Sequence, residues 1–350
     1  MKAGRNIDEY EMWFAESAGN KIRNLLPLYY EIGARGVFES GMLKRNKNNI
    51  DFFRKSLEIY NSEKISAVML DEEDYPILLK EIYDPPNILY YRGTLPNADD
   101  CCCAVVGSRK ATTYGRDVAY RLGYCLGLSG AVVVSGMAAG ADSCAHGGCI
   151  EAGGRTAAVL GTGVDSRASV SSRRLFERIL EGGGCVLSEF APGMPGAARN
   201  YPRRNRIISG MSCAVVVTEA AKRSGTSITA GLALEQGRDV YAIPGNINSV
   251  MSEGTNLLIK DGAIPLLSCD AIAEELGLTP ENEKNRSEVP SGLGSDENVI
   301  YNVVKKSGQI SVDLLSAKTG KTQTEVNAIL TILEIKGIIS RKMGKITIAI

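Results

Sequence analysis

Residues 199–206 hold the densest group of side chains that suit binding to a nucleic acid. Four arginines lie in this segment around Tyr201, which Pro202 follows. A guanidinium can bind one phosphate through two hydrogen bonds, and a tyrosine ring offers a flat face on which a base can stack. The alternative is a solvated turn whose arginines pair with acidic residues. Together with the glycine-rich loops elsewhere in the chain, the segment favours binding to a nucleic acid.

Glycine-rich or small-residue loops follow several expected strands, at Gly107–Lys110, Ser135–Asp142, Gly161–Asp165 and Ser224–Ser227. Each loop offers backbone N–H groups to an anion, and Arg109 adds a guanidinium. No loop has the Walker lysine pattern or the acidic residue that a dinucleotide site needs. One such loop is weak evidence because every doubly wound sheet needs tight turns. Several loops at one end of a sheet favour a ligand that carries phosphate.

Side chains suited to catalysis are scarce. His146 is the only histidine, and its place in a helical stretch favours a structural role over a Ser–His–Asp or metal role. The His/Cys spacing of metal sites is absent. Glu189, Glu219 and Glu235 could act as acids or bases, but none has an evident partner. We therefore expect a protein without catalytic residues, metal or cofactor.

Acidic and basic residues balance over the whole chain, at 40 of each, but not along it. Residues 101–270 carry a net charge of +4 and 25 of the 38 glycines, whereas residues 1–100 carry −4. A positive segment suits contact with a polyanion, although a solvated surface alone can produce so modest an excess. The middle of the chain is therefore where we look for a ligand.

The chain has the features of a cytoplasmic protein. Its nine cysteines form no Cys-x-x-Cys pair, and Cys101–Cys103 leads into an apolar run, so we expect reduced thiols within a strand. The N-terminus is acidic and lacks the apolar stretch of a signal peptide. Residues 122–141 carry no charge and could span a bilayer, but their five glycines favour a helix, a turn and a strand. We expect no contact with a membrane.

Short β-branched runs alternate with helical stretches through the middle of the chain. Buried strands are expected at 104–106, 131–134, 156–160, 186–188, 214–217 and 239–243. Helices are expected at 114–128, 142–152, 173–180 and 227–236. This alternation predicts an α/β fold with a doubly wound, mostly parallel sheet, whose ligands bind at the carboxyl ends of the strands.

Three further regions flank this core, which we place at 71–278 with an extra strand at Ile88–Tyr91. Residues 1–70 keep helical spacing of their apolar side chains, and the polar stretch 279–294 with its two prolines reads as a linker. In residues 295–350, a capping box at Thr322–Glu325 begins a helix, and two short strands end the chain. Three helices and a hairpin in this order predict a winged helix-turn-helix.

The core resembles the DNA-processing protein A (DprA/Smf) family, whose members bind single-stranded DNA and load the RecA recombinase during natural transformation. The matching stretches are Val105–Arg109, Ser135–Asp142 with His146, Gly153–Gly163, Leu187–Phe190, Tyr201–Ile208, Glu219–Thr229 and Gly254–Ala263. So many matches in one order are specific. The chain departs from the family after Asp165, where Ala168–Ser172 replaces the usual Tyr-Pro-x-x-Asn.

The resemblance implies roles for single residues. Arg109 resembles the arginine that contacts the DNA backbone in this family, and Tyr201 replaces a phenylalanine that contacts a base. Arg204, Asn205 and Arg206 match the basic motif. The residues expected at the DNA surface are Gly107, Ser108, Arg109, Lys110, Ser135, Gly136, Gly161, Arg199, Tyr201, Arg203, Arg204, Asn205, Arg206, Ser224, Gly225, Thr226 and Lys260.

The resemblance also implies an extended Rossmann-like core, an N-terminal SAM-like domain, a homodimer and RecA as partner. The expected function is that of a non-catalytic recombination mediator that binds single-stranded DNA. Two alternatives stay open. The first is a nucleotide-acting enzyme of the phosphoribohydrolase type, with Glu219 beside Ser224–Ser227. The second is a winged-helix transcription regulator whose core acts as a sensor.

Overall fold

The computed structural model describes residues 7–19, 22–43, 50–165, 170–222, 224–278, 293–307, 310–336, 338–342 and 345–348. The chain divides into two compact units, Met1–Glu281 and Asn282–Ile350. Most of the expected linker, 279–292, and residues 166–169 of the loop that departs from the family lie outside the described residues.

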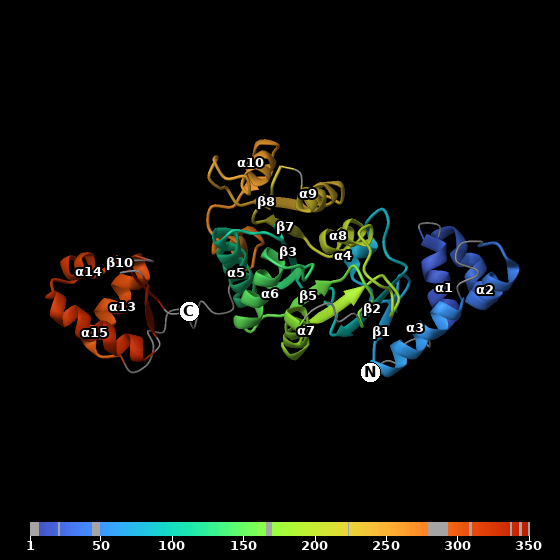
Figure 1. Ribbon diagram of the computed structural model, residues 1–350, viewed down its shortest axis with the longest axis horizontal. Coiled ribbons are helices and arrows are strands. Elements are labelled where there is room, and N and C mark those ends of the chain that lie inside the picture. The colour runs from blue at the N-terminus through green and yellow to red at the C-terminus, as the bar shows by residue number, and fades with distance from the viewer. Residues whose placement is uncertain are drawn as a thin grey trace. The chain divides into compact units, whose positions relative to one another are not determined.

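The described residues of the first unit form a nine-stranded sheet in the order β1-β2-β6-β5-β4-β3-β7-β8-β9 (Figure 1). Its strands are β1 (Ser66–Met69), β2 (Ile88–Gly93), β3 (Cys102–Val106), β4 (Val132–Ser135), β5 (Thr156–Val159), β6 (Cys185–Ser188), β7 (Ala214–Val217), β8 (Asp239–Ala242) and β9 (Ile264–Pro265). Strands β3 to β9 run parallel to one another, and the pairs β1–β2 and β2–β6 are antiparallel. The predicted α/β fold with a mostly parallel, doubly wound sheet is confirmed. Strand β1 lies in the range that we expected to be helical.

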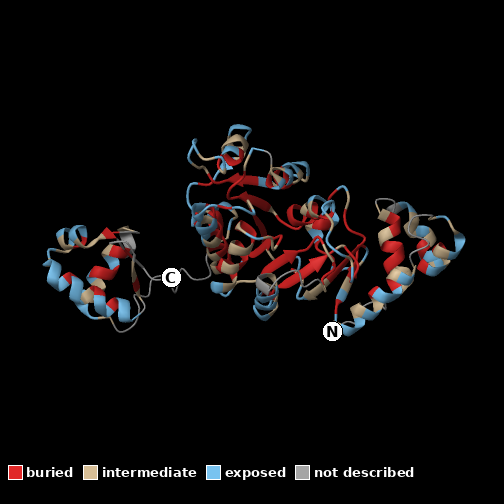
Figure 2. Cartoon of the chain, in the orientation of Figure 1, coloured by how far each residue is buried: buried red, intermediate tan, exposed pale blue. Residues whose placement is uncertain are grey.

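Helices cover both faces of the sheet. Five buried residues make up β3; Cys103 and Val105 face one layer, and Ala104 and Val106 face the other. The first layer contains α5 (Thr113–Leu128), α6 (Ala141–Glu151) and α11 (Ala271–Glu275), with α7 (Val170–Glu181) against β5 and β6. The second contains α4 (Ile77–Lys80), α8 (Asn200–Gly210) and α9 (Gly225–Glu235), and α10 (Glu253–Lys260) precedes β9. Figure 2 shows the buried strands between these layers. Burial on both faces explains why the strands are apolar runs without alternation.

Glycine lets α5 and α6 pack closely. A Cβ atom on Gly123 would lie 2.0 Å from the carbonyl oxygen of Ala145, and one on Gly148 would lie 2.0 Å from that of Tyr120. Any larger residue at either position would push the helices apart. Part of the glycine enrichment of the core therefore serves helix packing and not the approach of a ligand.

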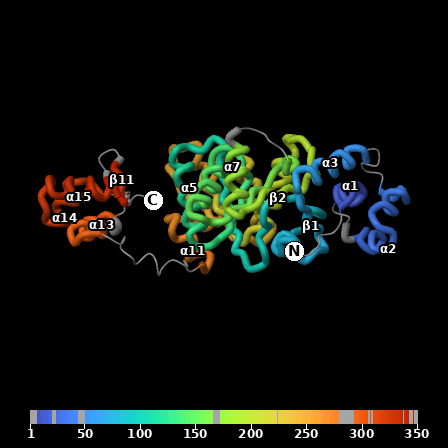
Figure 3. The backbone as a smooth tube through the Cα atoms, turned by 90° about the horizontal axis from the view of Figure 1, so that it is seen from below, coloured from blue at the N-terminus to red at the C-terminus, as the bar shows by residue number. Residues whose placement is uncertain are grey.

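Three N-terminal helices, α1 (Glu9–Ala18), α2 (Ile22–Ser40) and α3 (Ile50–Ser62), pack on one another beside the first strands of the sheet (Figure 3). Asp8 caps α1 by accepting the N–H groups of Tyr10 and Glu11. The side chain of Asn87 donates to the carbonyl oxygens of Ala15 and Gly19, at 2.6 and 3.0 Å. This contact ties the end of α1 to the turn before β2.

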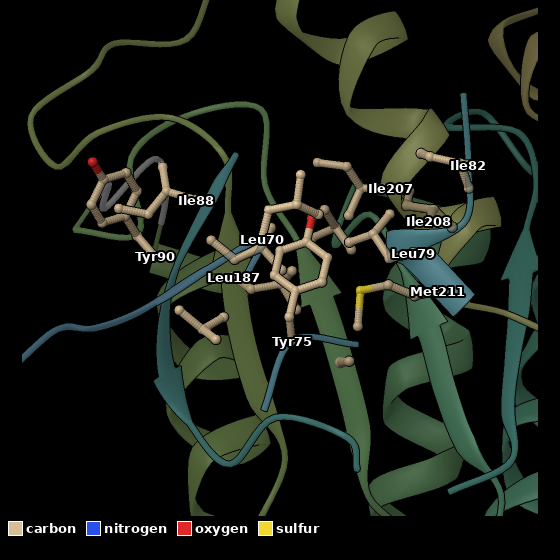
Figure 4. Close-up of a cluster of buried hydrophobic side chains, with 14 of the residues drawn as sticks. Leu70, Tyr75, Leu79, Ile82, Ile88, Tyr90, Leu187, Ile207, Ile208 and Met211 are labelled. Atoms are coloured by element: carbon tan, nitrogen blue, oxygen red, sulfur yellow. The ribbon is translucent and has the colours of Figure 1, made fainter. Parts of the chain in front are cut away.

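Helix α8 was not expected from the sequence, and a cluster of apolar side chains anchors it. Ile207, Ile208 and Met211 lie against Leu79 and Ile82 from the α4 segment (Figure 4). All five side chains are buried. The rest of α8 is polar, so this short apolar stretch fixes which side of the helix faces the sheet.

The second unit contains α13 (Ser295–Ser307), α14 (Val312–Thr319) and α15 (Gln323–Ile335) around an apolar core of its own. Strands β10 (Ile310–Ser311), β12 (Lys345–Ile348) and β11 (Ile339–Lys342) form an antiparallel sheet in this order. The predicted capping box of Thr322 and Glu325 is present at the start of α15. The three helices and the hairpin thus follow the predicted order.

The uncharged stretch 122–141 contains the end of α5, a turn and β4, as predicted. Among the described residues, no helix combines the length and apolar character that crossing a membrane requires.

We expect a chain truncated after Leu278 to keep the fold of the first unit. Among the described residues each unit has an apolar core of its own, so we expect the first unit to fold without the second. Circular dichroism should show a cooperative thermal transition with the midpoint of the core in the full chain. A broad transition, or one shifted down by many degrees, would contradict two separately folding units.

Candidate nucleic-acid interface

The chain changes direction across the sheet between β3 and β7. From β3 it crosses to β4 on one side, and it later returns to pair β7 with the other side of β3. Ligands of doubly wound sheets bind at such a point, beyond the carboxyl ends of the strands. A hollow of about 650 Å³ lies there, which we call the switch-point hollow. Its wall includes the Gly107–Lys110 loop, α8 and the N-terminus of α9.

Arg109 and Tyr201 lie together at this hollow. The guanidinium carbon of Arg109 is 5.0 Å from the centre of the Tyr201 ring, in a cation–π contact. Arg109 is exposed and Tyr201 is half-buried. Among the described residues, neither Arg109 nor Lys110 pairs with a carboxylate. Both cations are therefore available to an anion, and the ring lies next to one of them.

A second hollow of about 500 Å³, the side hollow, lies between the Gly161 loop and α7. Arg109 and Tyr201 line both hollows, so they form the wall between them. Four charged residues of the side hollow are already paired with each other: Arg92 lies 3.4 Å from Glu63, and Arg173 lies 3.1 Å from Glu177. The unpaired cation Lys110 lines only the switch-point hollow, so that hollow suits a polyanion better than the side hollow does.

Arg204 points into the protein. It is only 4% exposed, and its Nη1 donates to the carbonyl oxygens of Gly136, at 2.8 Å, and Val159. A Cβ atom on Gly136 would lie 2.6 Å from this guanidinium, so glycine is required there. Arg204 still lines both hollows. Its charge lies at the wall of both hollows, and its hydrogen bonds hold the loops after β4 and β5.

Asp142 is the buried acid beside these loops. Its carboxylate accepts the N–H of Gly136 at 3.1 Å and also those of Gly107 and Ala138. Burial raises the pKa of Asp142, and the charge of Arg204 and the three N–H groups oppose that shift. The sequence shows Asp142 only as part of a family motif. Asp142 joins two loops through its contact with Gly107, which lies more than thirty residues earlier in the chain, so no local pattern reveals this role.

Arg203 and Arg206 lie outside the switch-point hollow, and the burial of Arg206 corrects the expectation that its side chain contacts DNA. Arg206 is 8% exposed, and it binds Glu189 at 2.7 Å and Asp84 at 3.2 Å. Arg203 also binds Glu189, at 2.9 Å. The reason is the helix: successive residues of α8 turn by about 100°, so a cluster of arginines in sequence is spread around it. The alternative of arginines paired with acids holds for these two.

The expectation that Ser135 lies at the DNA surface is also corrected. It has no exposed surface, and its hydroxyl donates to the carbonyl oxygen of Val105 at 2.7 Å. It therefore joins β4 to β3 and cannot contact a ligand. Lys260, at the end of α10, is exposed but lines neither hollow, so the structure does not place it with the other cations.

Five of the expected residues line the switch-point hollow beside Arg109 and Tyr201: Ser108, Asn205, Ser224, Gly225 and Thr226. Ser108 accepts the N–H of Lys110 and so shapes the first loop. Ser224 caps α9, where Gly225 and Thr226 line the hollow, and the side chain of Asn205 reaches the carbonyl oxygen of Gly225 at 3.5 Å.

Gly161 and Arg199 complete the set. A Cβ atom on Gly161 would lie 3.0 Å from the Tyr201 ring, so glycine leaves room for it. Arg199 precedes α8 and is exposed, but it lines neither hollow.

Met137 packs against a small apolar cluster and lines the side hollow. Its φ of 54° lies in the left-handed region that non-glycine residues rarely adopt. Strained backbone of this kind is concentrated at functional sites. The flanking glycines were the only signal of an unusual turn.

Glu219, the candidate acid of the alternative enzyme, forms structural hydrogen bonds. It is buried, and its two oxygens accept the N–H of Thr112 at 2.8 Å and the Thr112 hydroxyl at 2.7 Å. It lines neither hollow. Glu219 thus positions the N-terminus of α5 and is not directed at a small ligand.

His146 is buried behind the hollow. Its Nδ1 lies 2.6 Å from the hydroxyl of Thr156, which donates to the carbonyl oxygen of Val133. Burial, and secondly the charge of Arg204, lower the pKa of His146 to about 3. The ring is therefore neutral and structural, as the sequence suggested.

The chain is similar in sequence to known proteins. Residues 66–277 match the family model of the DNA recombination-mediator protein A. The chain belongs to this family. It is 36% identical to the Smf protein of Escherichia coli over 313 residues, which cover 86% of this chain and 83% of that protein. It is 41% identical over 202 residues to the DNA processing protein DprA of Streptococcus pneumoniae, covering 57% of this chain and 71% of that protein.

Solved structures of DprA proteins share the fold. The protein from Streptococcus pneumoniae superposes with a TM-score of 0.64 at 33% identity, covering 77% of this chain and 99% of that one. DprA from Helicobacter pylori, described with a single-stranded DNA binding mode, gives a TM-score of 0.54 at 25% identity, covering 61% of this chain and 95% of that one. The second unit of this chain lies outside the matched family region.

We predict that His146 makes folding sensitive to mild acid. Between pH 7.5 and 5 the His146 ring takes up a proton in the unfolded chain but stays neutral in the folded chain. The free energy of unfolding therefore falls as the pH falls. The free energy of unfolding of the wild type should drop by about 2 kcal/mol more than that of His146→Asn over this interval. Urea titrations at several pH values measure both. An identical pH dependence of the two proteins would show that folding does not lower the pKa of His146 and would contradict the prediction.

Proposed function

We propose that this protein is a recombination mediator that binds single-stranded DNA in the switch-point hollow and loads RecA onto it. The observation that carries the proposal is the position of Arg109 and Tyr201. An exposed guanidinium and an aromatic ring lie together at the end of the sheet where doubly wound folds bind ligands. Single-strand binding needs these two groups, one for phosphate and one for a base.

The surroundings of the pair support a long anionic ligand. Lys110 extends the positive charge beyond Arg109, and the buried charge of Arg204 opposes that of Asp142. The nearby acids do not cancel it: Asp142 is bound by backbone N–H groups and Glu219 by Thr112. The hollow is also continuous with exposed surface at Arg109 and Gly225, so a strand could enter and leave.

DNA binding would change the Arg109–Tyr201 contact. The guanidinium now lies over the ring, so a base that stacks on that face must displace it. The displaced guanidinium would then bind a phosphate beside the ring, because its hydrogen bonds to phosphate are stronger than its contact with an aromatic face. The two residues would then bind adjacent parts of one nucleotide.

Relatives support the mediator role. The matched family is that of a recombination mediator, and the similar Helicobacter protein is described as binding single-stranded DNA. Action without catalysis, homodimerisation and RecA as partner are parts of our proposal that rest on this family membership. The occupied oxygens of Glu219 give the nucleotide-acting enzyme no support.

We expect Tyr201→Ala to weaken binding to oligo(dT) by roughly 1–3 kcal/mol, because a stacked base loses its platform. Tyr201→Phe keeps the ring and should bind nearly as well as the wild type. Fluorescence anisotropy at fixed salt measures both. A phenylalanine variant as weak as the alanine variant would attribute the effect to the hydroxyl and refute stacking.

We expect Arg109→Ala to weaken binding for every base composition alike, because phosphates carry no sequence information. The slope of log affinity against log salt should shrink by about 0.7, the contribution of one phosphate contact in a single strand. Arg109→Lys should restore part of the affinity, since it keeps the charge without the planar fork.

The matched control for Arg109 is Arg121→Ala, which removes the same charge from an exposed position of α5 that lines neither hollow. Its affinity and salt slope should equal those of the wild type. If Arg109→Ala behaved like Arg121→Ala with oligo(dT) but no longer bound mononucleotides, the hollow would be a nucleotide site and the proposed function would fail.

A further inference from the structure

Two cysteines meet at the other end of the central strands. Cys101 precedes β3 and Cys213 precedes β7, and their Sγ atoms lie 3.6 Å apart. Both are partly exposed, as is Cys144, whereas the other six cysteines are buried. Neither residue lines a hollow. This thiol pair is therefore separate from the proposed DNA surface, which lies at the carboxyl ends of the same strands.

The backbone brings the two thiols within reach of a covalent bond. Cys103 pairs with Ala214, and the N–H of Cys213 donates to the carbonyl oxygen of Cys102 at 2.9 Å. Neighbouring strands lie about 4.8 Å apart, within the Cα separations that disulfides bridge. The sulfur atoms need to approach by about 1.5 Å to bond. Rotation of the side chains outside the strands can supply this movement.

We propose that Cys101 and Cys213 form an oxidation site, which a peroxide converts into a disulfide between β3 and β7. This inference goes beyond the proposed function, since it concerns another part of the core and another chemistry. The contact between the two sulfur atoms lowers the pKa of Cys101 and raises the pKa of Cys213, whose thiol also donates to the carbonyl oxygen of Cys102 at 3.1 Å. Cys101 is thus the thiol that reacts first.

The reaction proceeds in two steps. The Cys101 thiolate attacks one oxygen of the peroxide, the O–O bond breaks, and the leaving oxygen takes a proton to give water or an alcohol. The sulfenic acid formed on Cys101 is then attacked by the Cys213 sulfur. The S–S bond forms as the S–O bond breaks, and the hydroxide leaves as water with the proton of Cys213. The two thiols lose two electrons, and the peroxide gains them.

The bond would connect residues 112 positions apart, so it closes a long loop of the chain that includes β4, β5, β6 and α8. A cross-link across a long loop restricts the unfolded chain and raises the midpoint of thermal unfolding. We expect the oxidised protein to melt higher than the reduced protein and dithiothreitol to reverse the difference.

The test treats the full chain with a few equivalents of hydrogen peroxide and counts thiols by alkylation and mass spectrometry. We expect the loss of two alkylation sites, and a proteolytic peptide pair joined through Cys101 and Cys213. Cys144→Ser, which removes the other partly exposed thiol, should give the same pair. In Cys213→Ser no internal disulfide should form, and a sulfenic acid trap should label Cys101.

Retention of all nine thiols after peroxide would overturn the proposal, as would a disulfide that involves any other cysteine. The wild-type peptide map decides this without any variant, so misfolding of a serine variant cannot obscure it. No step measures DNA binding, so failure of the DNA proposal would leave this result unchanged.

Discussion

The buried carboxylate of Asp142 holds together the loops that form the switch-point hollow. It accepts N–H groups of Gly107 after β3 and of Gly136 and Ala138 after β4. A carboxylate removed from water needs such hydrogen bonds and an opposite charge, and Arg204 supplies that charge from α8. The guanidinium is held in turn by carbonyl oxygens at the ends of β4 and β5. Loops after three strands and one helix therefore depend on two buried groups of opposite charge, Asp142 and Arg204.

Helix α8 is positioned from three directions, and this determines which of its residues reach the hollow. Arg204 fixes it to the loops, Arg206 fixes it to Glu189 and Asp84, and its apolar end packs on α4. Tyr201 projects from the remaining side, against Arg109. The arginines that do not face the hollow thus help to hold Tyr201 in place.

The sequence predicted the sheet well because buried parallel strands are continuous apolar runs, such as Val132–Ser135, that local pattern alone reveals. The sequence also singled out Arg109 and Tyr201 by loop position and residue type, and the structure brings these two residues together at one hollow. The roles of Arg203, Arg206 and Ser135 were not predictable. Their partners are set by helical rotation and by strand pairing, and no local pattern in a polar segment indicates which arginine will meet a distant acid. Helix α8 itself was missed because its apolar contacts occupy only its last turn.

A chain with no net charge can present a positive surface when its acids are directed inward. Asp142 and Glu219 lie near the hollow, but backbone N–H groups and the Thr112 hydroxyl occupy their oxygens. Glu189 lies behind α8 with two arginines. Donor groups or arginines bind the oxygens of each of these carboxylates at close range, and these contacts hold loops and helices together. Arg109, in contrast, is exposed. What a polyanion meets is therefore decided by which charges are paired, and the composition of the chain, with 40 residues of each sign, carries little information about it.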